Sequence, residues 1–229
     1  ESDPKTANYL IPVVQEIGDM TVATITPRMV RELGAILYPT AGTSTWTRQV
    51  VSPVRAVINN AHDLCKCGPI RIKGFSKSDK VAQDKKRGST GRSTYPPGSW
   101  EWLLAFRQHA DRKVATLALF MFVTGARIGQ ATAMHPDEHL DLQNARVCVP
   151  GAKGHHDRWL KIPMELVAEL ASLPRLWPRG WKRTSANLRV FGYADRTAPR
   201  KAWKSAIKAA KIEFIPFHAA GRHGFGQEM

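Results

Sequence analysis

The sequence has 229 residues, of which 43% are hydrophobic, and a formal net charge of +15 at pH 7. This length allows one large domain or two small ones with buried cores. The charge indicates a polyanionic partner, nucleic acid being the obvious one, although a ribosome-like or merely basic surface stays open. The longest apolar run, residues 114–123, is about half of a bilayer span, and no basic-then-apolar leader opens the chain. We therefore expect neither a membrane protein nor an exported one.

The three cysteines, Cys65, Cys67 and Cys148, are too few for a disulfide framework, which indicates a reducing cytosol. Cys65 and Cys67 with nearby His62 suggest zinc as an alternative. However, no second ligand pair follows at finger-like spacing. We expect reduced thiols at a helix end, no metal and no cofactor.

The first block, residues 1–67, is expected to be a helical domain. Thr26 followed by Pro27 is typical of a helix start, and apolar residues then recur at helical spacing up to Pro39. A second helix is predicted from about Ser44 to Gly68, with a kink or interruption at Pro53. Such a unit suits a DNA clamp, with a dimerisation unit as the alternative. The residues expected to face DNA from it are Arg48 and Arg55.

Residues 68–98 are rich in basic, Gly, Ser and Thr residues, which predicts a basic interdomain linker. It holds eight basic residues and only two acidic ones, Asp79 and Asp84. A strap of this kind can follow DNA phosphates without reading bases, and a solvated linker is the alternative. The residues predicted to contact DNA are Lys73, Lys77, Lys85, Lys86, Arg87 and Arg92.

The second block, residues 99–229, is expected to be mainly α with a small antiparallel β-sheet, an α+β fold. The apolar run ending at Gly125 predicts a core helix. Further helices are predicted to begin at Ser99, Pro163 and Thr197 and after Pro216, and strands at Arg146–Val149, Arg158–Ile162 and Leu188–Phe191. Two more cations expected to contact DNA, Lys201 and Lys204, lie on the helix predicted over residues 197–211.

Four residues of the second block could converge on one phosphate. Arg127 follows the core helix, Lys153 belongs to the predicted hairpin, and His218 and Arg222 belong to the last helix. Guanidinium groups bind two nonbridging phosphate oxygens at once, and lysine or histidine can transfer a proton. Each residue alone has a plainer interpretation: Arg127 could pair with Asp141 or Glu138, and Lys153 could be an ordinary turn lysine.

In this order the residues resemble the tyrosine recombinase (phage integrase) family. Thr124-Gly-Ala-Arg127 is similar to its first arginine box, Ala152-Lys153-Gly154 lies where the family keeps a hairpin lysine, and Arg222-His-Gly-Phe-Gly226 resembles its second arginine box. The resemblance implies a core-binding domain over 1–67 and a catalytic domain over 99–229. It also implies site-specific recombination through a 3′-phosphotyrosyl intermediate, with double-stranded DNA half-sites and other protomers as partners in a bacterial cytoplasm.

By this resemblance Arg127 and Arg222 hold the scissile phosphate, Lys153 is the general acid, and His218 assists proton transfer. Three features depart from the family pattern. His218 lies four rather than three residues before Arg222, Gln130 stands where an acidic residue is common, and no tyrosine follows Arg222. We therefore expect a fragment that binds DNA but cannot cleave it, its nucleophile lying beyond Met229.

Two other classes stay open. The chain could be a noncatalytic DNA-binding accessory or regulatory protein with an integrase-like fold, or a basic RNA-binding module. His135, His139, His155 and His156 are expected to be surface or strand-end residues rather than metal ligands. His223 is a minor alternative to His218.

Overall fold

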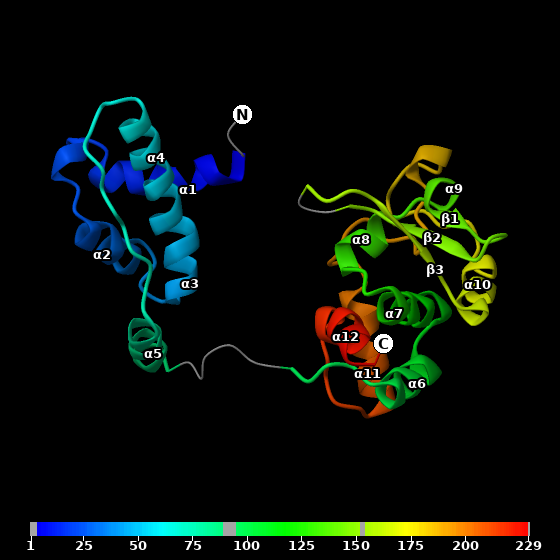
Figure 1. Ribbon diagram of the computed structural model, residues 1–229. Helices are drawn as coiled ribbons and strands as arrows, with labels where there is room; N and C mark the ends of the chain where they lie inside the picture. The colour runs from blue at the N-terminus through cyan, green and yellow to red at the C-terminus, as the bar shows by residue number, and fades with distance from the viewer. Residues whose placement is uncertain (1–3, 89–94, 152–153, 229) are drawn as a thin grey trace. The chain divides into compact units, whose positions relative to one another are not determined.

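A computed structural model describes residues 4–88, 95–151 and 154–228, with the side chains of residues 4–7 left out. The chain divides into two compact units, Glu1–Ser93 and Thr94–Met229, each with its own hydrophobic core. The fold is mainly helical with one small antiparallel sheet, which confirms the predicted class. Figure 1 shows the elements of each unit.

The first unit is helical throughout its described secondary structure. Its helices are α1 (Pro4–Ile17), the 3₁₀ turn η1 (Val22–Thr24), α2 (Pro27–Leu37), α3 (Thr43–Trp46), the π turn η2 (Thr47–Val51), α4 (Ser52–Asp63) and α5 (Lys77–Lys86). The Thr26 side chain accepts a hydrogen bond from Met29 N, 3.2 Å away, and thereby caps α2 as predicted. Pro53 lies at the start of α4, just after the π turn, which accounts for the predicted interruption.

The segment predicted to be a linker differs in the structure, because it contains helix α5. Ser76 caps this helix: its hydroxyl accepts from Asp79 N and the Asp79 carboxylate accepts from Ser76 N. Helix α5 is joined to the rest of the first unit through Gln83, whose amide donates to Ala41 O at 3.1 Å. Ile72 is also buried in the core of this unit. The first unit thus extends to Ser93 rather than to residue 67.

The second unit is built around one buried helix, α7 (Arg112–Thr124), whose residues from Val114 onward are all buried. This confirms the expected core helix. Around it lie α6 (Trp100–His109), α8 (Ile128–Ala133), α9 (Pro136–His139), α10 (Met164–Ala171), the 3₁₀ turn η3 (Ser185–Asn187), α11 (Arg200–Ala210), the π turn η4 (Ala219–His223) and α12 (Gly224–Glu228).

The sheet of the second unit has the antiparallel order β1 (Leu140–Asp141), β2 (Arg146–Val149) and β3 (Arg158–Lys161). Val147 pairs with Leu140 on one side and with Leu160 on the other. The β2–β3 hairpin was predicted and is confirmed, but the prediction of a strand at Leu188–Phe191 is wrong. That segment turns instead, Gly192 N donating to Arg189 O at 3.0 Å, and its apolar side chains enter the core without forming a ladder.

Helix α11 begins at Arg200 rather than at Thr197. The Asp195 carboxylate accepts hydrogen bonds from the backbone amides of Thr197 and Ala198 and from the Thr197 hydroxyl, at 2.6 to 3.1 Å. Ala198 precedes Pro199, and the residue before a proline is disfavoured in the helical conformation, so the helix starts only after this turn. No helix in the described ranges is long and apolar enough to cross a membrane.

Candidate active site

Helix α7 ends so that the following arginine leaves the core. The buried Thr124 hydroxyl donates to Phe120 O at 2.6 Å and accepts from Ala126 N at 3.3 Å. Gly125 adopts a left-handed conformation, φ 64°, and a Cβ there would lie 2.9 Å from the Phe225 ring. Ala126 is buried and Arg127 is the first exposed residue. The Thr-Gly-Ala-Arg sequence therefore turns the chain and presents the Arg127 side chain to solvent.

Arg222 reaches the same helix end from η4. Gly221 lets the backbone of η4 lie against α7, since a Cβ there would lie 2.8 Å from Met121 Cβ. One Arg222 guanidinium nitrogen then donates to Gly125 O at 3.3 Å. Cations are favoured at a helix C-terminus, where carbonyl groups lack partners. Two arginines separated by 95 positions in the sequence thus meet at the end of α7.

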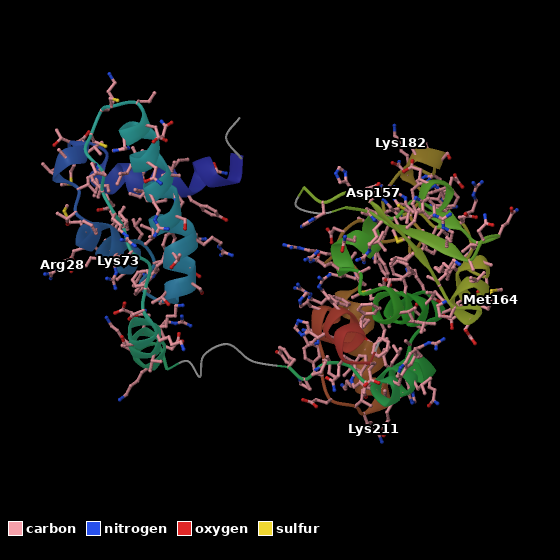
Figure 2. All side chains as sticks on the ribbon, in the orientation of Figure 1. Arg28, Lys73, Asp157, Met164, Lys182 and Lys211 are labelled. Atoms are coloured by element: carbon pink, nitrogen blue, oxygen red, sulfur yellow. The ribbon has the colours of Figure 1, made fainter. Side chains whose placement is uncertain are left out.

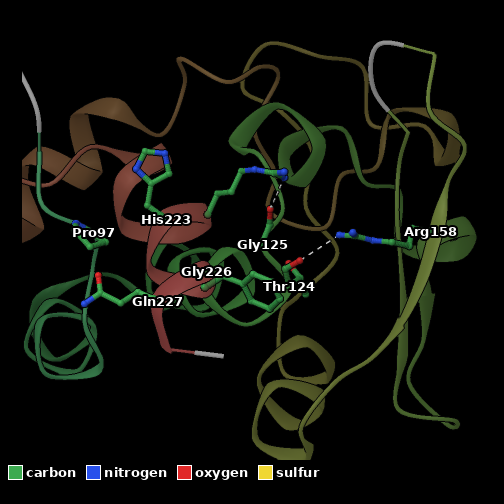
Figure 3. Close-up of a pocket in the computed structure, with 9 residues that line it drawn as sticks. Pro97, Thr124, Gly125, Arg158, His223, Gly226 and Gln227 are labelled. Atoms are coloured by element: carbon green, nitrogen blue, oxygen red, sulfur yellow. Dashed lines mark hydrogen bonds between the residues drawn. The ribbon is translucent and has the colours of Figure 1, made fainter. Parts of the chain in front are cut away.

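A third arginine, not predicted as a site residue, approaches from strand β3. An Arg158 guanidinium nitrogen donates to Thr124 O at 3.4 Å, so that Arg158 and Arg222 contact neighbouring carbonyls of one helix end (Figure 3). In the sequence, Arg158 is recognisable only as the first residue of a predicted strand. It becomes a site residue through the pairing of β3 with β2, in which Arg158 lies opposite Val149.

Two cavities adjoin these side chains, and Arg158 and Arg222 line both of them. The first, about 560 Å³, is also lined by Thr124, Gly125 and His223 and by the start of α12. The second, about 450 Å³, is lined by Arg127, Gln130 and the hairpin residues His155, His156 and Asp157. Its one acidic side chain, Asp157, already accepts a hydrogen bond from Gly151 N at 2.7 Å. These cavities therefore present three guanidinium groups with little opposing charge.

Arg127 does not have the plainer role considered for it. Its guanidinium takes part in no ion pair within the described ranges, and the Asp141 carboxylate accepts from the Asn144 amide at 2.9 Å instead. The arginine is thus available to an anion.

Gln130 connects Arg127 to the base of the hairpin. Its side-chain oxygen accepts from Arg127 N at 3.0 Å and its nitrogen donates to Pro150 O at 2.6 Å. A carboxylate in this place could accept the first bond but could not donate the second. The glutamine therefore positions both elements that carry the predicted cations.

The histidines of the last helix are arranged differently from the prediction. His223 lines the first cavity, whereas His218 is not among the lining residues and its ring packs against the ring of His223, with centroids 4.5 Å apart. The π turn explains this contact, because residues five apart lie next to each other in a π-helical turn. The wider histidine–arginine spacing of the sequence thus coincides with a local change of helix type.

The other predicted site residues have varied surroundings. Lys153 and Arg92 lie outside the described residues. Arg48, Lys77, Lys85, Lys201 and Lys204 are exposed, and Lys73 and Lys86 line a cavity of the first unit with Arg28, Arg31 and Arg71. Arg87 lies 3.6 Å from Asp84. Arg55 donates to Ile72 O at 2.6 Å and thus holds the chain after α4 in place, a structural role.

None of the four tyrosines lines either cavity of the second unit. Tyr193 is buried beside Lys113, whose ammonium lies 4.3 Å from its ring centroid. Burial, with the nearby Asp111 charge, raises the pKa of Tyr193 well above its usual range. No set of His, Cys, Asp and Glu side chains in the described part of the chain could hold a metal ion.

The chain has the fold of the tyrosine recombinases and integrases. It is similar to the Tn1549 transposon integrase in complex with transposon right end DNA, with 14% identity, a TM-score of 0.70 and coverage of 99% of this chain and 81% of that one. It is also similar to a lambda integrase dimer, residues 75–356, bound to a COC′ core site. There the identity is 12%, the TM-score 0.63 and the coverage 98% and 80%. No protein-family model and no curated protein matches the sequence.

Proposed function

We propose that this chain is the DNA-binding and phosphate-activating part of a tyrosine-type site-specific recombinase. The observation that supports this most is the convergence of Arg127, Arg158 and Arg222 on adjoining cavities in a chain with the integrase fold. Similarity to integrases solved on DNA supports double-stranded DNA half-sites as the substrate, and the lambda integrase dimer supports assembly of protomers on them. Such a protein would act in a bacterial cytoplasm.

In the proposed reaction, Arg127 and Arg222 bind the nonbridging oxygens of the scissile phosphate and stabilise the charge that develops on them. A tyrosine hydroxyl attacks phosphorus, the bond to the 5′ oxygen breaks, and Lys153 protonates that leaving oxygen. Attack of a 5′ hydroxyl on the 3′-phosphotyrosyl bond rejoins a strand and releases the tyrosine. We place Arg158 beside this phosphate as a third cation.

A histidine of the last helix would assist proton transfer, and the geometry supports His223 for this part rather than His218. His223 borders the cavity directly, and the His218 ring contacts the His223 ring edge to face, with centroids 4.5 Å apart. This proposal assigns the attacking hydroxyl to none of the four tyrosines present, since none of them lines either cavity.

The positions of the tyrosines also favour a second function, that of an accessory DNA-binding protein without catalysis. The two functions share the arginine site and differ in the chemistry that follows binding. Incubation of a nicked site with the natural protein would separate them, since only the enzyme forms a covalent protein–DNA adduct.

A test of the site itself begins with in vitro selection of duplexes that bind this chain. In the selected site, one phosphate at a time is replaced by neutral methylphosphonate, and affinities are measured for the wild type and for Arg222→Ala. We expect one phosphate per half-site whose neutralisation and Arg222→Ala are coupled by about 1.5 kcal/mol or more. The matched control is Arg200→Ala, which removes an exposed arginine that lines neither cavity. Additive effects at every phosphate would refute the proposal.

A further inference from the structure

A basic loop of the second unit, residues 175–189, carries charges that the candidate active site does not use. Residues 172–194 contain five basic residues and no acidic one. Arg175 lies 3.8 Å from Asp137, whereas no ion pair within the described ranges involves the other four. These four are Arg179, Lys182, Arg183 and Arg189. None of the five lines either cavity of the candidate active site.

The loop is ordered by its own hydrogen bonds. The Trp177 indole donates to Thr184 O at 2.8 Å and the Asn187 amide donates to Lys182 O at 2.9 Å. Trp181 N donates to Pro178 O at 3.1 Å, forming a turn around Gly180. The exposed cations are therefore presented by a defined structure, which reduces the entropy lost when they bind a ligand.

The base of the loop is fixed to the core of the unit. The buried His135 ring bonds to Ser185 O at 2.8 Å through Nε2 and accepts from Asp137 N through Nδ1. A carbonyl can only accept, so Nε2 is the donor in this pair. Arg189 N donates to Leu176 O at 3.0 Å and closes the loop where it leaves the core.

Two tryptophans of the loop lie beside its arginines. The Arg183 guanidinium lies 5.9 Å from the Trp177 ring centroid, and that of Arg189 lies 5.3 Å from the Trp181 centroid. Trp181 remains 39% exposed, an uncommon place for a tryptophan that has only a packing role. Stacking on an aromatic ring orients a guanidinium. The Arg189 guanidinium also donates to Leu188 O at 2.6 Å and to Ala186 O at 3.3 Å, so Arg189 mainly holds the loop together. No hydrogen bond within the described ranges occupies the Arg183 guanidinium, whose N–H donors can bind phosphate oxygens.

We propose that the 175–189 loop is a second DNA-binding site, which holds the phosphate backbone of duplex DNA outside the contacts of the candidate active site. Its partner rests on the proposed function, since a recombinase already holds DNA. The absence of any acidic residue over 172–194 favours a uniformly anionic surface. An acidic protein surface would usually be matched by charges of both signs. Figure 2 shows Lys182 extending from the second unit into solvent.

The test measures affinity for a duplex of arbitrary sequence as a function of salt. The triple variant Arg179→Gln, Lys182→Gln, Arg183→Gln removes three exposed cations. The slope of log K against log salt changes by about 0.9 for each lost phosphate contact, so the variant should lose about 2 to 3 from its magnitude. The matched control is Arg112→Gln, Lys208→Gln, Lys211→Gln, which removes three exposed cations elsewhere on the same unit and should keep the slope nearly unchanged. Thermal unfolding would check that both variants are folded.

Equal changes in the two triple variants would overturn the proposal, because the effect would then come from net charge alone. No change in the loop variant would overturn it as well. Polyglutamate provides a third arm: an equal loss of polyglutamate and DNA affinity in the loop variant would overturn the assignment to DNA and favour an acidic protein partner. Trp181→Ala should weaken DNA binding by a smaller factor, about twofold to fivefold, since it removes the ring on which Arg189 stacks and loosens the loop without removing a cation.

Repeating the salt series in the Arg222→Ala background separates this inference from the proposed function. If the loop is an independent site, its contribution to the slope stays the same there. A failed coupling at Arg222 with a preserved loop effect would contradict the active-site proposal and leave the loop as a DNA-binding site. A preserved coupling at Arg222 with no effect of the loop variant would support the active-site proposal and contradict the loop as a DNA-binding site.

Discussion

Three arginines of the first unit and the two that contact the end of α7 in the second unit have different partners. In the first unit Arg31 lies 2.6 Å from Asp79, Arg28 lies 2.7 Å from Glu32, and Arg55 donates to Ile72 O. In the second unit Arg158 and Arg222 make only long hydrogen bonds to carbonyls, at 3.4 and 3.3 Å, beside a cavity. Basic residues that look equivalent in the sequence therefore divide into structural cations and available ones. The density of charge along the chain does not make this distinction.

The largest effect on this difference between the units is expected from Arg222→Ala. We expect the dissociation constant for the selected DNA site to rise about tenfold to a hundredfold, because a charge-assisted hydrogen bond to phosphate contributes about 1.5–3 kcal/mol. The free energy of unfolding should change by no more than about 0.5 kcal/mol, since the bond to Gly125 O is long and Arg222 is an exposed residue. Fluorescence anisotropy and urea unfolding measure the two. A large loss of stability with little effect on binding would make Arg222 a structural cation like those of the first unit.

A substitution in the turn that presents Arg127 should have the next largest effect, here on the free energy of unfolding. Gly125→Ala places a Cβ at φ 64°, 2.9 Å from the Phe225 ring, and we expect a loss of about 2 kcal/mol in the free energy of unfolding. Gly129→Ala is the matched control, since its Cβ would meet open space within helix α8. That change should stabilise the protein by about 0.5–1 kcal/mol. Similar effects of the two substitutions would show that Gly125 is not required for the turn.

Much of the second unit could be predicted because its signals are local. The apolar run that became α7, the glycine that ends it and the two strands of the hairpin are each determined by neighbouring residues, and all were confirmed. The first unit shows the limit of composition. Its charge and small polar residues predicted a linker, yet Ser76 and Asp79 form a capping box that starts α5, a signal also present in the sequence.

The remaining site features depend on long-range packing. Arg158 looked like an ordinary strand residue until the hairpin brought it to the end of α7, which lies 34 positions away along the chain. The wide spacing of His218 and Arg222 was visible, but not the π turn that accommodates it. Gly221 lets this turn lie close to Met121, a long-range contact that no local pattern reveals.

Arg31→Ala is the counterpart of Arg222→Ala in the first unit. This arginine pairs with Asp79 and its guanidinium lies 5.0 Å from the Phe75 ring centroid. Its removal should lower the stability of the first unit by about 1 kcal/mol, a value reduced by partial exposure. DNA affinity should fall less than twofold beyond the effect of net charge, which Lys66→Ala, at an exposed lysine of the same unit, would measure. A strong and specific loss of binding would move Arg31 into the class of available cations.

Tyr193→Phe tests the tyrosine that lies nearest in sequence to the second arginine. The Tyr193 hydroxyl is buried with no hydrogen-bond partner in the described structure, so its removal should stabilise the second unit by about 1 kcal/mol. DNA binding and any covalent adduct of the recombinase should be unchanged. Tyr95→Phe, at an exposed tyrosine, should have little effect on stability. Loss of the adduct in Tyr193→Phe would instead make this residue the nucleophile and contradict its structural role.

The smallest effect is expected from the pH dependence of the first unit. Hydrogen bonds from the Ser76 amide and hydroxyl, with a lesser contribution from Arg31, hold the pKa of Asp79 below its usual 3.8. A carboxyl whose pKa is lower in the folded state than in the unfolded one stabilises the protein above the unfolded pKa. That stabilisation is lost as the pH falls through the folded value. The difference in stability between the wild type and Asp79→Asn should therefore be constant near neutral pH and shrink from about pH 4 toward pH 2. Asp19→Asn, at an exposed carboxylate outside any ion pair in the described ranges, serves as the control. If the difference does not shrink, the capping box of α5 does not depend on the ionised Asp79.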